Sequence, residues 1–262
     1  MITGGSSGIG FAIAKELARQ GSHVHIAARR PDVLEGAVTA IRAACPNSTG
    51  QVTAYQCDIA SRADVAALFD RLRSAASAPS IVVNSAGVTG GGYFQSIPVE
   101  DFERIMQINF FGTLYVTKEA VADMLVAGEG WILNISSVAG QMAVFGLAPY
   151  CASKFAVNGF TQTIRKEMKK HGISVSLLCP PDTDTPMLEG DAANPPETRA
   201  LASTAGVLSP ETVARAAIDG MRSGRALIVP GFEAKFITTA HRWAPGIVAR
   251  VEDWVIRRAV PR

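Results

Sequence analysis

Short apolar segments alternate with longer helical patterns over most of this chain of 262 residues. Such alternation predicts βαβ units, and therefore a parallel sheet with helices on both faces. We predict an α/β, Rossmann-type, doubly wound fold. The predicted strands are His23–Ala28, Val52–Gln56, Ile81–Val83, a segment beginning at Trp131, and Ile173–Leu178; the predicted helices cover 9–20, 32–44, 63–76, 99–127 and a segment from Pro149.

A glycine-rich segment, G-G-S-S-G-I-G from Gly4 to Gly10, follows the first apolar residues almost at once. Glycines allow the backbone to approach a pyrophosphate, and the amides of the following helix point at it. A lone segment of this kind is also typical of an ordinary glycine-rich loop. Because few residues precede it, we expect either a truncated first strand or a natural chain that begins upstream of Met1.

The second predicted strand ends at Ala28 and runs into Arg29 and Arg30. In a dinucleotide fold an acidic residue at this point binds the ribose hydroxyls of NAD, whereas arginine pairs with the 2′-phosphate of NADP. Two arginines and no carboxylate therefore favour NADP. The alternative is a solvated basic turn.

Tyr150 and Lys154 stand four residues apart in a predicted helix and therefore share one face of it. The pKa of a phenol is about 10, and a neighbouring ammonium lowers it toward the range of a useful acid or base. Ser136 and Ser137 end the preceding strand, where a hydroxyl can polarise a carbonyl oxygen. By itself the Tyr/Lys pair is more often a surface contact.

Asn109 lies among Met106, Ile108, Phe110 and Phe111 in the long predicted helix, where a polar side chain needs partners. It is either a satisfied core amide or a residue that binds backbone or water below the active site.

The composition excludes several classes of partner. A net charge of +2 gives no reason to expect nucleic acid. The four cysteines and four histidines are dispersed, so we expect reduced thiols in a cytoplasmic protein and no metal site. No apolar run is long enough to span a bilayer.

Together these motifs resemble those of the short-chain dehydrogenase/reductase family, over residues 2–229. The matching segments are T-G-G-S-S-G-I-G at Thr3–Gly10, Asp58, N-S-A-G at Asn84–Gly87, Asn109, Ser137, and Y-C-A-S-K at Tyr150–Lys154. The resemblance implies about seven strands. It also implies a homodimer or homotetramer formed through the long helix and the Tyr150 helix.

The resemblance assigns catalytic roles to four residues. Ser137 would polarise the substrate and Tyr150 would donate the proton. Lys154 would bind the nicotinamide ribose and lower the pKa of Tyr150, and Asn109 would hold a relay water. The remaining NADPH contacts implied are Gly4, Ser6, Ser7, Gly8, Ile9 and Gly10 at the glycine loop, Arg29 in NADP-preferring members, Asp58 and Ile59 at the adenine, and Asn84, Ala86 and Gly87 at the adjoining ribose.

A narrower resemblance involves C-P-P-D-T-D-T-P at Cys179–Pro186, P-P-E-T-R at Pro195–Arg199, and Q-x-x-x-F-G from Gln141. These segments are similar to those of 3-ketodihydrosphingosine (3-dehydrosphinganine) reductases, which reduce the 3-keto group of a long-chain sphingoid base with NADPH. Pro180, Thr183 and Thr185 would then lie at the nicotinamide.

We predict an NADP-binding reductase domain over 1–231 and an amphipathic helical tail over 232–262. Residues 186–208 would form a substrate lid, with Met187, Leu188 and Leu201 facing an acyl chain, or only a surface excursion. The tail combines Trp243 and Trp254 with arginines. It would either lie on an anionic membrane surface or pack on its own domain or a partner subunit.

The predicted reaction is NADPH-dependent reduction of a ketone to a secondary alcohol, with 3-ketodihydrosphingosine or a similar long-chain 3-keto lipid as substrate. A second hypothesis keeps the chemistry and changes the substrate to a 3-oxoacyl thioester, a steroid or another carbonyl compound. A third, of another class, is a silent NADP-binding regulatory protein. The intact set Asn109, Ser137, Tyr150 and Lys154 argues against the third.

Overall fold

The computed structural model describes residues 1–190, 194–202 and 206–259, so parts of the predicted lid and the last three residues of the predicted tail lie outside the described residues. A seven-stranded sheet with the order β3-β2-β1-β4-β5-β6-β7 forms its centre, and every neighbouring pair of strands is parallel. The strands are β1 (Ile2–Thr3), β2 (Val24–Ala28), β3 (Val52–Gln56), β4 (Ile81–Asn84), β5 (Gly130–Ile135), β6 (Ile173–Leu178) and β7 (Leu227–Ile228).

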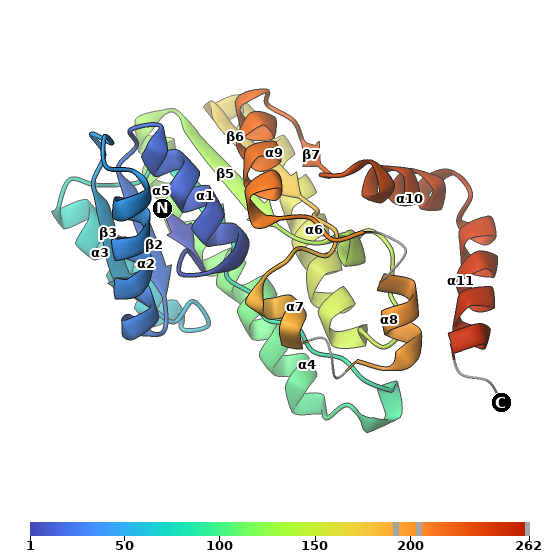
Figure 1. The fold of residues 1–262 in the computed structure, drawn as a ribbon. Helices are drawn as coiled ribbons and strands as arrows, with labels where there is room; N and C mark the ends of the chain where they lie inside the picture. The colour runs from blue at the N-terminus through green and yellow to red at the C-terminus, as the bar shows by residue number, and fades with distance from the viewer. Residues whose placement is uncertain (191–193, 203–205, 260–262) are drawn as a thin grey trace.

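Helices cover both faces of this sheet (Figure 1). They are α1 (Gly8–Arg19), α2 (Pro31–Ala44), α3 (Arg62–Ser74), α4 (Val99–Met106), α5 (Gly112–Ala127), α6 (Ala148–Met168), α7 (Pro186–Gly190), α8 (Pro196–Ala202), α9 (Pro210–Arg222), α10 (Phe232–Trp243) and α11 (Pro245–Ala259). One core packs α1, α2 and α9 on the sheet, and a second packs α3 and α5 on the opposite face. The predicted doubly wound α/β fold is confirmed.

Consecutive residues of one strand belong alternately to these two cores. Val83 and Leu133 belong to the first, whereas Val82 and Ile132 belong to the second. Because side chains alternate across a strand, a run of consecutive apolar residues is what a sheet buried on both faces requires.

The long helix predicted over 99–127 is interrupted. Between α4 and α5, residues Gln107–Phe111 form a turn of π-helix that contains the buried Asn109. A π turn inserts one extra residue into the helix and so redirects the side chains around it. Ile108 of this turn lines the cavity described below, so the turn forms part of its wall.

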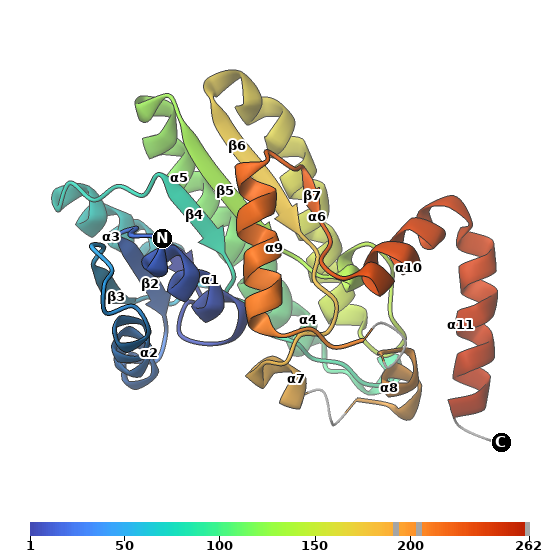
Figure 2. The same ribbon diagram turned by 45° about the horizontal axis from the view of Figure 1, so that its top comes forward.

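The C-terminal part of the chain leaves the sheet after β7. Helices α10 and α11 extend outward at that end, and α11 packs against α8 (Figure 2). Both helices expose large apolar side chains, with Trp243 81% and Phe232 79% exposed. Among the described residues, none of the helices has the length and apolar character needed to cross a membrane.

Candidate active site

A cavity of about 1020 Å³ opens at the carboxyl ends of the central strands, the place where open α/β sheets bind ligands. It extends from the glycine loop to the C-terminal helices. The residues predicted for the site that line it are Gly4, Ser6, Ser7, Gly8, Ile9, Arg29, Asp58, Ile59, Ala86, Gly87, Ser137, Tyr150, Lys154, Pro180, Thr183 and Thr185.

Three predicted residues do not line this cavity. Gly10 is the third residue of α1, and a Cβ on it would stand 2.5 Å from the Gly4 carbonyl oxygen. The Asn84 side chain is buried and donates hydrogen bonds to Thr117 Oγ1 (3.0 Å) and Asn134 Oδ1 (2.8 Å). Asn109 is also buried. These residues support the cavity wall from behind.

The glycine loop between β1 and α1 has a backbone that side chains would disturb. Gly4 has φ +65°, and a Cβ on it would lie 2.7 Å from Ala86 Cα. Thr3 Oγ1 accepts hydrogen bonds from the amides of Ser85 and Ala86 at 3.2 and 3.3 Å, which fixes the turn after β4 beside this loop. The two turns therefore form one wall.

The first turn of α1 points into the nucleotide end of the cavity. Ser7 is its N-cap residue and, within the described chain, its side chain makes no capping hydrogen bond. Uncapped amides and the positive end of the helix dipole suit an anionic ligand. Arg29 and Arg30, which follow β2, line the same end. The residues present therefore fit a dinucleotide with an additional phosphate.

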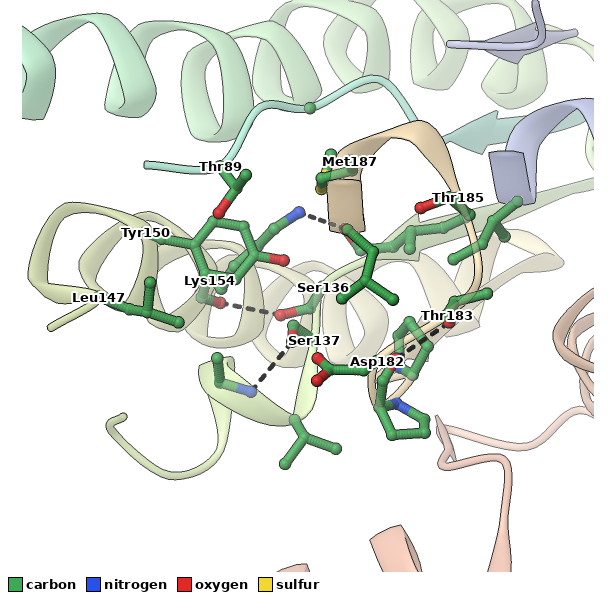
Figure 3. A pocket seen from close by; sticks show the side chains of 18 of the residues that line it. Thr89, Ser136, Ser137, Leu147, Tyr150, Lys154, Asp182, Thr183, Thr185 and Met187 are labelled. Carbon is green, nitrogen blue, oxygen red and sulfur yellow. Dashed lines mark hydrogen bonds between the residues drawn. The ribbon is translucent and has the colours of Figure 1, made fainter. Parts of the chain in front are cut away.

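Tyr150 and Lys154 lie on the first turns of α6, and both side chains line the cavity (Figure 3). The Lys154 Nζ lies 5.6 Å from the centre of the Tyr150 ring and donates to the Ile135 carbonyl oxygen at 3.1 Å. Burial lowers the pKa of Lys154 from 10.5 to about 8. This ammonium therefore stays mostly charged at neutral pH but releases its proton far more readily than an exposed lysine.

The two serines at the end of β5 have different roles. Ser136 is buried, and its hydroxyl donates to the Lys154 carbonyl oxygen at 3.1 Å. Ser137 is half-buried in the cavity wall, and its oxygen accepts a hydrogen bond from the Ala139 amide at 3.1 Å. An acceptor role toward the backbone leaves the Ser137 proton available for a ligand oxygen.

Asn109 joins three elements of the site. Its Oδ1 accepts from the Val88 amide at 2.8 Å, and its Nδ2 donates to the Val88 carbonyl oxygen and to Ser153 Oγ, both at 2.9 Å. The side chain is therefore satisfied within the core and also binds backbone, so it has features of both alternatives considered. It ties the turn after β4 to α6, and the water relay remains a prediction.

The far end of the cavity is apolar and is formed largely by segments that the sequence did not place there. Met187, Leu188 and Leu201 line it, as the lid hypothesis expects. Further lining residues are Val144 and Leu147 before α6, Phe236 and Ile237 on α10, and Ile247, Val248, Val251 and Val255 on α11. The helical spacing of the α11 residues was visible in the sequence, but it did not reveal which surface they would face.

The described part of the chain contains no group of three or more histidine, cysteine or acidic side chains arranged to hold a metal ion. The side chains of Tyr150, Lys154 and Ser137, which line the cavity, are suited to acid–base and electrostatic catalysis.

The sequence profile of the short chain dehydrogenase family matches residues 1–195. The chain belongs to this family. A solved structure, the short-chain dehydrogenase from Sphingobium yanoikuyae in complex with NADPH, superposes with a TM-score of 0.78 at 28% identity, covering 95% of this chain and 92% of that one.

Two curated relatives indicate the range of related activities. The 3-dehydrosphinganine reductase of Danio rerio is 34% identical over 217 residues, which cover 82% of this chain and 65% of the relative. A putative ketoacyl reductase of Streptomyces coelicolor is 34% identical over 189 residues, covering 71% of each chain. The chain thus spans somewhat less than two thirds of the first relative's length.

Proposed function

We propose that this protein reduces a ketone to a secondary alcohol with NADPH, using Tyr150 as the proton donor. The observation that carries the proposal is the convergence of Tyr150, Lys154 and Ser137 on one cavity whose opposite ends suit a dinucleotide and an apolar molecule. When bound, NADPH supplies the hydride that reduces the ketone carbon.

Side chains of the protein stabilise and then neutralise the negative charge that develops on the ketone oxygen. The Ser137 hydroxyl, held by the Ala139 amide, donates to that oxygen and stabilises the negative charge that develops on it. Tyr150 then transfers its phenolic proton to the oxygen. The buried Lys154 ammonium favours the resulting phenolate, which makes the tyrosine a stronger acid.

NADPH is favoured over NADH by the residues after β2. Arg29 and Arg30 line the nucleotide end of the cavity where a 2′-phosphate would lie, and Ala28 occupies the position of the carboxylate expected for NAD. A guanidinium binds a phosphate dianion through charge-assisted, bidentate hydrogen bonds, which are stronger than any bond that it donates to a neutral ribose hydroxyl.

The proposed substrate is 3-ketodihydrosphingosine or a similar long-chain 3-keto lipid. The apolar walls formed by α7, α8, α10 and α11 enclose space for an alkyl chain. The similarity to the 3-dehydrosphinganine reductase of Danio rerio also supports this substrate class. An acyl chain gains about 0.8 kcal/mol for each methylene removed from water, so a long apolar cavity favours long ketones.

The decisive test is a comparison of substrates at equal NADPH concentration. Purified protein is supplied with 3-ketodihydrosphingosine, a 3-oxoacyl thioester or a steroid ketone in the same detergent micelles, and the alcohol products are identified by mass spectrometry. We expect the highest kcat/KM for the sphingoid ketone. A much higher value for the thioester would favour a ketoacyl reductase, the second candidate, which the Streptomyces relative supports.

We also propose that the α10–α11 segment contacts an anionic membrane surface. Phe232, Trp243 and Trp254 expose apolar rings beside basic residues, and Arg258 stacks 4.0 Å from the centre of the Trp254 ring. Aromatic side chains mixed with arginines suit a lipid interface. Co-sedimentation with phosphatidylserine vesicles, but not with phosphatidylcholine vesicles, is the expected result, and loss of binding on Trp243→Ser would support it.

A homodimer or homotetramer is the oligomeric state proposed, formed through α5 and α6. Phe111, the last residue of the π turn before α5, and Phe155 on α6 are 36% and 44% exposed, which leaves apolar area for a partner subunit to cover. Light scattering coupled to size-exclusion chromatography measures the mass directly, and a monomer would contradict this proposal.

A further inference from the structure

Asp182 introduces a carboxylate into the catalytic end of the cavity that no step of the reaction described above uses. It follows Pro180 and Pro181 in the segment after β6 and is half-buried among the cavity-lining residues. Figure 3 shows its carboxylate directed from this segment toward Ser137, on the side of the cavity where Tyr150 also lies.

The backbone around Asp182 is held in place from two directions. The Asp182 carbonyl oxygen accepts from the Leu208 amide, and the Leu208 carbonyl oxygen accepts from the Asp184 amide, both at 2.9 Å. On the other side, the Val138 amide donates to the Pro180 carbonyl oxygen at 3.0 Å, which joins the segment to the residue following Ser137. The backbone that carries this carboxylate is therefore fixed beside Ser137, the residue proposed to donate to the ketone oxygen.

The charged residues that line the cavity fall into three groups. Arg29, Arg30 and Asp58 belong to the nucleotide end, and Arg199 and Glu252 belong to the helices of the far end. Only Lys154 and Asp182 remain near Tyr150 among the described lining residues. Lys154 is itself a cation and donates to the Ile135 carbonyl oxygen, so a positive charge on the substrate would be attracted to the Asp182 carboxylate.

We propose that Asp182 is a specificity-determining residue that binds an ammonium group on the carbon next to the ketone. This inference rests on the proposed function and deepens it, since a sphingoid ketone carries an amino group at that position. The ammonium and carboxylate form a charge-assisted pair close to the reacting carbon. A neutral ketone does not form this charge-assisted pair, so Asp182 favours amino ketones over neutral ones.

The test compares Asp182→Asn with Asp184→Asn on two ketones. Asp184 is the matched control because it is exposed, lies two residues away in the same segment and is not among the cavity-lining residues. The ketones are 3-ketodihydrosphingosine and the same molecule with a hydroxyl in place of the amino group. NADPH affinity is measured for each variant by fluorescence titration, so that damage to the nucleotide end is recognised.

For Asp182→Asn we expect kcat/KM on the amino ketone to fall by about 10- to 100-fold, the loss typical of a charged hydrogen bond. The value for the hydroxyl analogue stays within about threefold, and NADPH affinity is unchanged. In the wild type, KM for the amino ketone rises as the pH increases and the ammonium loses its proton, whereas the variant lacks this rise.

Equal losses on both ketones, or an equal loss for Asp184→Asn, would overturn the proposal for Asp182 while leaving the reductase function intact. A wild-type protein that reduces both ketones equally well would also overturn it. A wild-type protein that reduces neither, but reduces other ketones, would overturn the proposed substrate and this inference together.

Discussion

The two ends of the cavity are built in different ways. The nucleotide end consists of backbone at the carboxyl ends of neighbouring strands, held by sheet hydrogen bonds and by Thr3, which bonds the turn after β4. The far end consists mainly of side chains from α7, α8, α10 and α11, with Val144 and Leu147 before α6. None of the described residues of α11 is fully buried, so its position depends on contacts along one face, chiefly with α8.

We infer from this difference that the nucleotide end serves the chemical step and that the far end determines substrate selectivity. The nucleotide end tolerates few substitutions because its geometry is fixed by the backbone. It would bind the cofactor, which is common to reductases that differ in substrate. The helical end can change its lining residues at little cost to the core, since its helices pack outside the two main hydrophobic clusters. Variants at the two ends should therefore fail in different ways.

Lys154→Met should give the largest effect on turnover with no loss of fold. Without the ammonium, Tyr150 loses the group that strengthens it as an acid, and kcat should fall by about 10²- to 10⁴-fold. The shift in the pKa of Lys154 from 10.5 to about 8 corresponds to a cost of up to about 3 kcal/mol for keeping the charge buried. The variant should therefore match or exceed the wild type in free energy of unfolding.

The same variant predicts a pH dependence. Below pH 8 the lysine is protonated in both the folded and the unfolded chain, and the full cost applies. Between about pH 8 and 10.5 only the unfolded chain binds the proton, so this contribution to wild-type stability rises with pH. The stability difference between Lys154→Met and wild type, measured by urea unfolding, should shrink across that range. A constant difference would contradict the assignment.

Gly4→Val tests whether the nucleotide end depends on its backbone. The glycine has φ +65° and an added Cβ would lie 2.7 Å from Ala86 Cα, so the substitution should cost about 1–3 kcal/mol and weaken NADPH binding. Gly36→Ala in α2 is the control, because a Cβ there meets no atom within 4 Å. Isothermal calorimetry and thermal unfolding measure both quantities; wild-type NADPH affinity in Gly4→Val would contradict the account.

Arg29→Ala should alter cofactor choice and leave the sheet unaffected. Loss of a charge-assisted contact with the 2′-phosphate should raise KM for NADPH by about 10- to 100-fold, while KM for NADH stays the same. Steady-state kinetics with both cofactors at saturating ketone provide the measurement. Equal changes for NADPH and NADH would place the arginine outside the phosphate site.

Val251→Asp should have the smallest effect and should be confined to the far end. A carboxylate on this face of α11 would raise KM for a long-chain ketone by a few-fold, because it disfavours the apolar chain, and leave a short ketone unaffected. Val126→Asp on α5 is the control, since Val126 is 91% exposed and does not line the cavity. An unchanged KM for both ketones would show that α11 does not contact the substrate.

The sequence sufficed where local pattern determines structure. The bounds of β3 and β6 coincide with those predicted, because each is a short β-rich run between turn residues. The motif residues of the nucleotide end come together in the cavity because parallel strands place their carboxyl ends at one edge.

Prediction from the sequence failed where packing between segments distant in the chain determines the structure. The π turn at Gln107–Phe111 contains Asn109, whose bonds to Val88 and Ser153 join segments distant in sequence, and helical periodicity does not reveal such bonds. The inward direction of the Asn84 side chain depends on Thr117 and Asn134. Likewise, an amphipathic pattern in α11 identifies an apolar face but not the surface that it meets.

The most direct test of the central claim measures NADPH oxidation with 3-ketodihydrosphingosine in detergent micelles, for the wild type and for Tyr150→Phe. The account predicts turnover in the wild type, a loss of about 10²-fold or more in the variant, and equal NADPH affinity in both. Turnover that survives in Tyr150→Phe would contradict the role given to this tyrosine. NADPH binding without oxidation by any ketone would contradict the enzymatic function itself.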